Sequence, residues 1–143
     1  MSTNALAFRA TLHCLTGCAI GEVSGMAIGT AAGLDNVTTV VLAVTLAFVF
    51  GYLLTMWPLL RAGTAFAPAL RTALAGDTVS IVIMETIDNA FVAAVPGAMD
   101  AHVADPLFWG AIALGFVIAF PFAYLANRWM IARGAGHAHG AHH

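Results

Sequence analysis

Two cysteines and a glutamate follow one another at four-residue intervals near the start of the chain, as Cys14, Cys18 and Glu22. On an α-helix this spacing places the three side chains on one face, about one turn apart. Two thiols in this arrangement can share a soft metal ion, with Cu(I) as the first choice and zinc as the alternative. Met26 extends the row with a thioether, and His13 precedes the first thiol. These five residues are therefore candidate metal ligands.

A second group with the same potential is Met84, Glu85 and Asp88, which lie within about 100° of one another on a helix. A carboxylate near the middle of a membrane span costs about 2.5 to 3.5 kcal/mol. The chain has no Lys, and no Arg lies near the middle of an expected span to pair with Glu22, Glu85 or Asp88. These acids must therefore be protonated, hydrogen-bonded or bound to a cation.

The composition indicates the environment of these residues. Of the 143 residues, 61% are hydrophobic and only 8% are charged, and the mean hydropathy is +0.90. Soluble domains carry roughly 25% charged residues, so the expected surroundings are a lipid bilayer. A net charge of −2 without a basic run argues against nucleic-acid binding. Two cysteines are too few for a disulfide scaffold.

Crossing a bilayer takes roughly 20 apolar residues in a helix. Four segments qualify, at about 6–29, 37–60, 78–99 and 107–131. The sequence thus predicts an all-α fold, a four-transmembrane-helix bundle over 1–135. Gly76 and Asp77 are expected to cap the third span after a connection over 63–76, and Asp105 the fourth, with Pro106 at its first position. Pro96 and Pro121 are expected to interrupt spans three and four.

The arginines predict the orientation, because positive residues near span ends stay in the cytoplasm. All five lie at one side of such a bundle, while three acids lie at the other: Arg9, Arg61, Arg71, Arg128 and Arg133 against Asp35, Asp100 and Asp105. Both termini are therefore expected in the cytoplasm. Only spans one and three carry internal acids, which hints at two parallel helical hairpins.

A row of glycines borders the polar face of the first span: Gly17, Gly21, Gly25 and Gly29. Small residues at this spacing let a second helix approach closely, so these glycines are predicted to serve helix packing. If they pack on span three, the thiols, Met84 and the carboxylates converge at one depth. The row also favours a homo-oligomer.

The last residues, 136–143, form a histidine-rich segment that is predicted to be a flexible tail. Imidazoles there could capture metal at the cytoplasmic face, and a merely solvated tail is the alternative. The auxiliary candidates are His137, His139, His142 and His143.

Several of these motifs together resemble a known family. They are His13-Cys14, Gly17-Cys18, Gly21-Glu22, Met84-Glu85-Thr86, Asp88-Asn89, Pro96-Gly97-Ala98-Met99 and Phe108-Trp109-Gly110, with a basic, histidine-rich end. The chain resembles a small bacterial membrane family, domain of unknown function 4396. The resemblance implies a four-helix integral protein of the bacterial inner membrane, and some members carry copper-related labels.

Three functions stay open at this point. The first is a membrane protein that handles a soft metal, Cu(I) before zinc, for transport or homeostasis. The second is a membrane oxidoreductase that uses the thiol pair or a bound metal, with the carboxylates as proton relay. The third is an assembly subunit without chemistry, so whether the protein is an enzyme is undecided.

Overall fold

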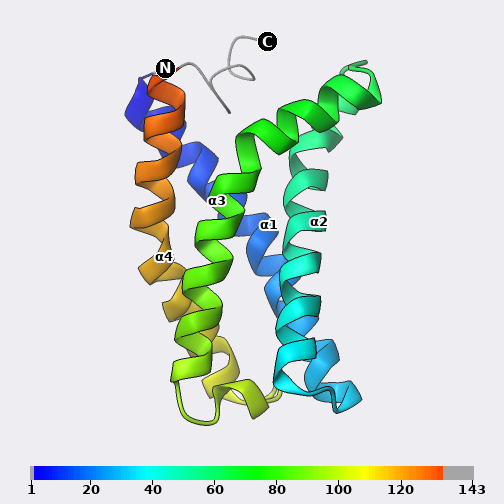
Figure 1. Ribbon diagram of the computed structural model, residues 1–143, viewed down its shortest axis with the longest axis vertical. Coiled ribbons are helices and arrows are strands. Elements are labelled where there is room, and N and C mark those ends of the chain that lie inside the picture. Colours follow the sequence, from blue (N-terminus) through cyan, green and yellow to red (C-terminus); the bar gives the residue numbers. More distant parts are fainter. Residues whose placement is uncertain (1, 134–143) are drawn as a thin grey trace.

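The computed structural model describes residues 2–133 and confirms the all-α, four-helix prediction (Figure 1). Each long helix is long and apolar enough to cross a membrane. Many large apolar side chains are exposed on their outer faces, which indicates a lipid environment. The elements are α1 (Thr3–Ala32), α2 (Asn36–Arg61), α3 (Phe66–Ala94), the short 3-10 helix η1 (Ala98–Asp100) and α4 (Pro106–Ala132).

The helix starts follow local capping chemistry. The Asp35 side chain accepts a hydrogen bond from the Thr38 backbone N–H at 3.1 Å and begins α2. The Thr38 hydroxyl donates a second bond to this carboxylate, and both bonds lower the pKa of Asp35. Asp105 caps α4 through the Leu107 N–H at 2.9 Å, with Pro106 at the first helical position, as predicted.

The third helix differs from its prediction at both ends. It begins at Phe66 rather than near Thr78, so 63–76 is largely helix and not a loop. The reason is a small-residue contact, since Ala69 and Ala73 are buried against Met56 of α2. A hydropathy window does not register such packing. Asp77 consequently lies inside α3, 1% exposed, and does not cap it.

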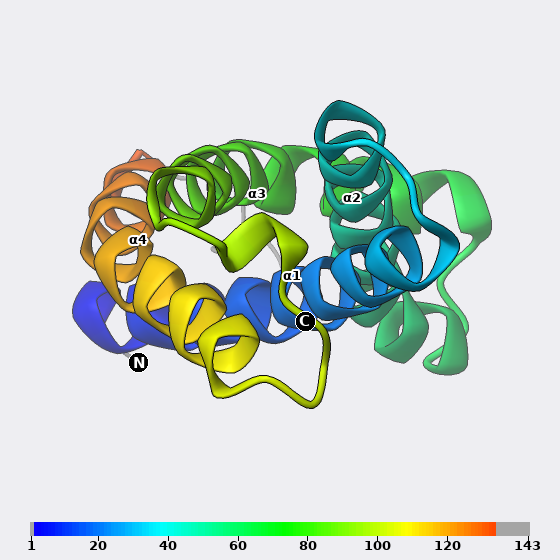
Figure 2. The ribbon, with the colours of Figure 1, turned by 90° about the horizontal axis from the view of Figure 1, so that it is seen from below.

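The other end of α3 also lies elsewhere. The helix stops at Ala94, and Gly97 follows in a left-handed conformation with φ 80° before η1. Pro96 therefore lies outside the helix and interrupts nothing, whereas Pro121 does lie within α4. Figure 2 shows the connection from α3 to α4, including η1, lying across this end of the bundle.

The glycine row of α1 lies against α2, not against α3 as expected. A Cβ atom on Gly17 would lie 2.7 Å from the Gly51 Cα atom, and one on Gly21 or Gly25 would overlap the backbone of Ala47 or Ala43. α2 offers its own small residues at four-residue spacing, so the two backbones meet directly. This contact leaves the acidic face of α1 free to meet α3.

The bundle has two chemically different ends. The first turn of α1 and the last turns of α4 lie together, where the Arg128 Nε atom donates to Asn4 Oδ1 at 2.7 Å. We call this the arginine end, because all five arginines lie near it, each exposed. The opposite end is called the acidic end and carries Asp35, Asp100 and Asp105.

Candidate cation site

Three carboxyl groups meet inside the bundle. Glu22 comes from α1, and Glu85 and Asp88 come from α3, with one oxygen of each within 4.8 Å of the other two. Their side chains are 0%, 2% and 0% exposed, respectively. We call this group the acidic triad. Two packed helices thus bring together acids that lie far apart in the sequence.

Local packing explains why the three acids meet. Glu85 and Asp88 lie on the buried face of α3, and Glu22 lies beside the glycines that hold α1 on α2. α4 contributes space through Gly115, since a Cβ atom there would overlap the Asp88 side chain, with Asp88 Cγ only 3.0 Å away. Sequence reasoning missed Gly115. The signal that could have indicated its role is the position of a glycine among bulky apolar residues of the fourth span.

The triad has few hydrogen-bond donors. Asn89 Nδ2 donates to Glu22 Oε2 at 3.3 Å and to the Glu85 backbone carbonyl at 2.8 Å. The other five carboxyl oxygens of the triad accept no bond from an N–H or hydroxyl group within residues 2–133, and Asn89 Oδ1 is also unpartnered there. One oxygen of each carboxyl group lies within 4.8 Å of one oxygen of each of the other two. Two carboxyl groups can share a hydrogen bond only when one of them retains a proton.

This arrangement restricts the charge that the triad can carry. Ionised carboxylates removed from water need a compensating charge. The arginines are all exposed and cannot reach the triad, because they lie near the arginine end. The triad must therefore hold protons or a cation. Oxygen ligands suit hard cations, and Ca²⁺, which binds oxygens at about 2.4 Å, has ligand oxygens no more than about 4.8 Å apart. The three ligand oxygens of the triad lie within that limit of one another.

The thiols supply no ligand atom to the triad, although the sequence predicted that the thiols and the carboxylates converge. Cys14 and Cys18 are both free and buried, with their Sγ atoms 3.6 Å apart. Glu22, rather than a thiol, supplies the ligand atom of α1 that lies within 4.8 Å of those of Glu85 and Asp88. Met26 and Met84 are buried in the same hydrophobic cluster as the thiols.

His13 belongs to a different polar network. Its Nε2 atom lies 2.8 Å from the Thr55 hydroxyl, which donates to Asp77 Oδ2 at 2.5 Å. The one hydroxyl proton is used on the carboxylate, so His13 Nε2 carries a proton and donates to Thr55. This network links α1, α2 and α3 nearer the arginine end. Sequence reasoning missed it because Asp77 was assigned to a helix cap.

A second buried network lies near the arginine end as well. Asn127 Nδ2 of α4 donates to the Thr11 hydroxyl of α1 at 3.0 Å and to the Ser80 hydroxyl of α3 at 3.2 Å. All three side chains are 0% exposed. The bundle is thus polar along much of its axis. The four histidines predicted to capture metal, His137, His139, His142 and His143, lie outside the described residues.

The fold and the triad together define a class, namely a four-helix protein able to span a membrane, with an acidic group inside the bundle. The chain belongs to the family described as Domain of unknown function (DUF4396), whose sequence pattern matches residues 3–136. The family resemblance noted from the motifs is thereby confirmed. No curated protein and no solved structure matches the chain.

Proposed function

We propose that this protein binds a cation inside the membrane and exchanges it for protons, with Glu22, Glu85 and Asp88 as the ligands. One observation carries the proposal: the three acids share one buried site that no arginine among residues 2–133 reaches. Exchange of a cation for protons involves no electron transfer. The activity is therefore transport or homeostasis of a cation rather than catalysis.

The chemistry of the ligands defines the class of ion. Carboxylates and the Asn89 amide are oxygen donors, which favour hard cations such as Mg²⁺, Ca²⁺ and Mn²⁺ over soft ones. When no ion is bound, protons on the carboxyl groups keep the site uncharged. Binding of a divalent ion then requires that those protons leave. Ion and proton occupy the same oxygens and exclude each other.

The setting of this activity follows from the charge distribution. We place the protein in the bacterial inner membrane as a multi-pass protein, with the arginine end in the cytoplasm, because basic residues flanking spans are retained there. A single bundle of four helices is narrow for a permeation route. We therefore infer that the working unit is a homo-oligomer.

A soft-metal site at the thiols is the second candidate. Two sulfurs that each lie about 2.3 Å from one ion and 3.6 Å from each other subtend about 100° at the ion, near the tetrahedral angle. Cys14 and Cys18 therefore suit Cu(I) or Zn²⁺ with further ligands, and the buried thioethers of Met26 and Met84 are of the soft type that Cu(I) favours. This site does not need the triad.

Metal binding by the detergent-purified protein separates the candidates. Binding of Mn²⁺ is measured by the loss of the electron-paramagnetic-resonance signal of the free ion. We expect wild type and Cys14→Ser/Cys18→Ser to bind Mn²⁺ equally well. We expect Glu85→Gln and Asp88→Asn to lose the high-affinity Mn²⁺ site. Both acid substitutions retain shape and remove charge. Unchanged Mn²⁺ binding in these acid variants would overturn the proposal.

Elemental analysis of the same samples tests the thiol candidate. Copper or zinc that copurifies with wild type and disappears in Cys14→Ser/Cys18→Ser would support a soft-metal site. If the acid substitutions change only the oligomeric state and leave all metal content unchanged, the protein is an assembly subunit instead.

A further inference from the structure

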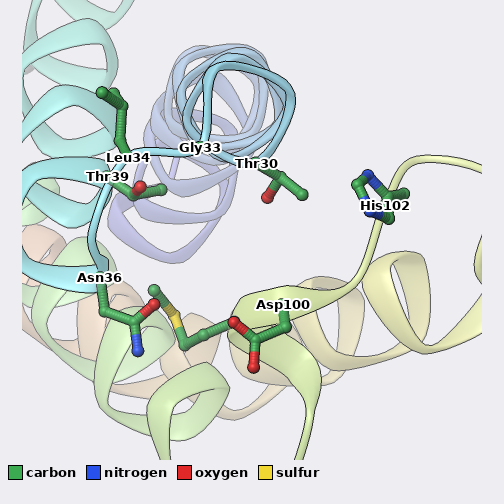
Figure 3. Close-up of a pocket in the computed structure, with 8 residues that line it drawn as sticks. Thr30, Gly33, Leu34, Asn36, Thr39, Asp100 and His102 are labelled. Atoms are coloured by element: carbon green, nitrogen blue, oxygen red, sulfur yellow. The ribbon is translucent and has the colours of Figure 1, made fainter.

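A polar pocket opens at the acidic end, at a distance from the triad. It has a volume of about 310 Å³ and lies between the end of α1, the start of α2 and η1 (Figure 3). We call it the acidic-end pocket. The lining residues used below are Thr30, Asn36, Thr39, Met99, Asp100 and His102.

The charge around the pocket favours cations. Asp100 lines it, Asp35 and Asp105 lie at the same end of the bundle, and every arginine lies near the opposite end. An end of one sign attracts counter-ions and raises their local concentration. The His102 imidazole and the amide oxygen of Asn36 add two further metal-binding groups to the walls. Asp100 is the one charged ligand.

One buried side chain faces the pocket without a partner. Thr39 is 3% exposed and lines the pocket from the first turns of α2. Its hydroxyl makes no hydrogen bond to another group among residues 2–133. A buried hydroxyl is ordinarily paired with protein or ordered water. The Thr39 hydroxyl can therefore donate and accept hydrogen bonds to water in the pocket.

The pocket lies farther along α1 than the triad. Thr30 and Glu22 are both on α1, eight residues apart, which is about 12 Å along the helix. The buried side chains of Met26 and Val92 lie between them along α1 and α3. An ion that waits in the pocket is thus separated from the triad by about two helical turns of apolar side chains.

We propose that the acidic-end pocket is a loading site for a hydrated divalent cation, with Asp100 as the inner ligand and His102, Asn36 and Thr39 holding its waters. The pocket has room for such an ion, because six waters take roughly 30 Å³ each. Divalent ions commonly bind through one carboxylate while they keep several waters. This inference rests on the proposed function, since the triad is the site to which the ion passes.

Mn²⁺ binding to the full chain, again followed by electron paramagnetic resonance, tests the proposal. We expect wild type to show a high-affinity site and a second, weaker site. Asp100→Asn is expected to weaken only the second site, by about tenfold, which corresponds to about 1.4 kcal/mol. His102→Gln should weaken the same site less. The matched control is Asp105→Asn, which removes one charge from the same end outside the pocket lining and keeps a capping residue.

The triad variants keep the two claims apart. Glu85→Gln should lose the high-affinity site and retain the weaker one, whereas Asp100→Asn should do the reverse. If Asp100→Asn and Asp105→Asn weaken the second site equally, the effect is general surface charge and the loading site is refuted. A wild type with only the high-affinity site also refutes it and leaves the triad proposal standing.

Discussion

The four long helices form two pairs that differ in the residues they bury. α1 and α3 carry the buried acids, Glu22, Asp77, Glu85 and Asp88, while α2 and α4 carry none. α2 and α4 instead provide close contacts: Ala43, Ala47 and Gly51 meet the glycines of α1, and Gly115 accommodates Asp88. The comparison teaches that an acidic site inside a bilayer depends on neighbours without charge, which exclude lipid and set the distance between the acids.

The largest effect is expected where α1 meets α2. Gly21→Ala places a methyl group into the Ala47 backbone, which cannot move aside as a side chain can. We expect a loss of about 3 kcal/mol in the free energy of unfolding, measured by thermal unfolding in detergent. Gly110→Ala is the matched control, because nothing lies within 4 Å of a Cβ atom there. Equal effects of the two substitutions would break the comparison at this contact.

The next effect tests whether α4 provides space for the triad. Gly115→Ala forces the Asp88 side chain to shift, so we expect a loss of about 1 to 3 kcal/mol in stability. We also expect weaker Mn²⁺ binding, because a shifted carboxylate no longer completes the site. A binding isotherm recorded beside the unfolding curve checks both. A variant that binds Mn²⁺ as wild type does would show that Asp88 needs no help from α4.

A smaller effect is expected where α2 contributes a hydroxyl group to the network of His13 and Asp77. Thr55→Val removes the hydroxyl between His13 and Asp77. Loss of a hydrogen bond that leaves a buried partner unsatisfied costs about 1 to 3 kcal/mol, which chemical unfolding can detect. Thr45→Val on the same helix is the control, because the Thr45 hydroxyl is exposed and bonds only the Val41 carbonyl. If the control loses as much, the network adds nothing to stability.

The smallest effect is expected at the cap of α2. Hydrogen bonds from Thr38 lower the pKa of Asp35 in the folded protein. The ionised cap therefore stabilises the fold at neutral pH, and this contribution is lost as the pH falls through the lowered pKa. Asp35→Asn keeps a capping side chain but should remove this acid-dependent part. The measurement is the melting temperature between pH 7 and pH 3, with Asp105→Asn as the comparison at the other cap.

Much of the fold could be predicted from the sequence, and the predictions that were wrong have physical reasons. Apolar length predicted four helices, and capping chemistry predicted the start of α4 at Asp105 and Pro106. The start of α3 was wrong because its first turns are held by Ala69 and Ala73 against Met56. Alanines carry little hydropathy signal, so their packing appears only once the partner helix is known.

The site was predicted in its residues more than in its grouping. The absence of a basic residue near the middle of the spans indicated that Glu22, Glu85 and Asp88 belong to a site for protons or a cation, and the structure brings these three acids together. Helix periodicity gave the face of each residue but not the partner of that face. The glycine row could have met either neighbour, and the structure shows that it contacts α2. The role of Gly115 could not be predicted either, because the sequence does not show which side chain packs against it.

The most direct test of the central claim is the number of protons released when Mn²⁺ binds. It is obtained from calorimetric titrations of the purified protein in buffers that differ in ionisation enthalpy. A triad that holds protons in the absence of an ion should release at least one proton per high-affinity Mn²⁺ ion bound, and Glu85→Gln should lose this exchange. Mn²⁺ binding at the triad without proton release would contradict the account.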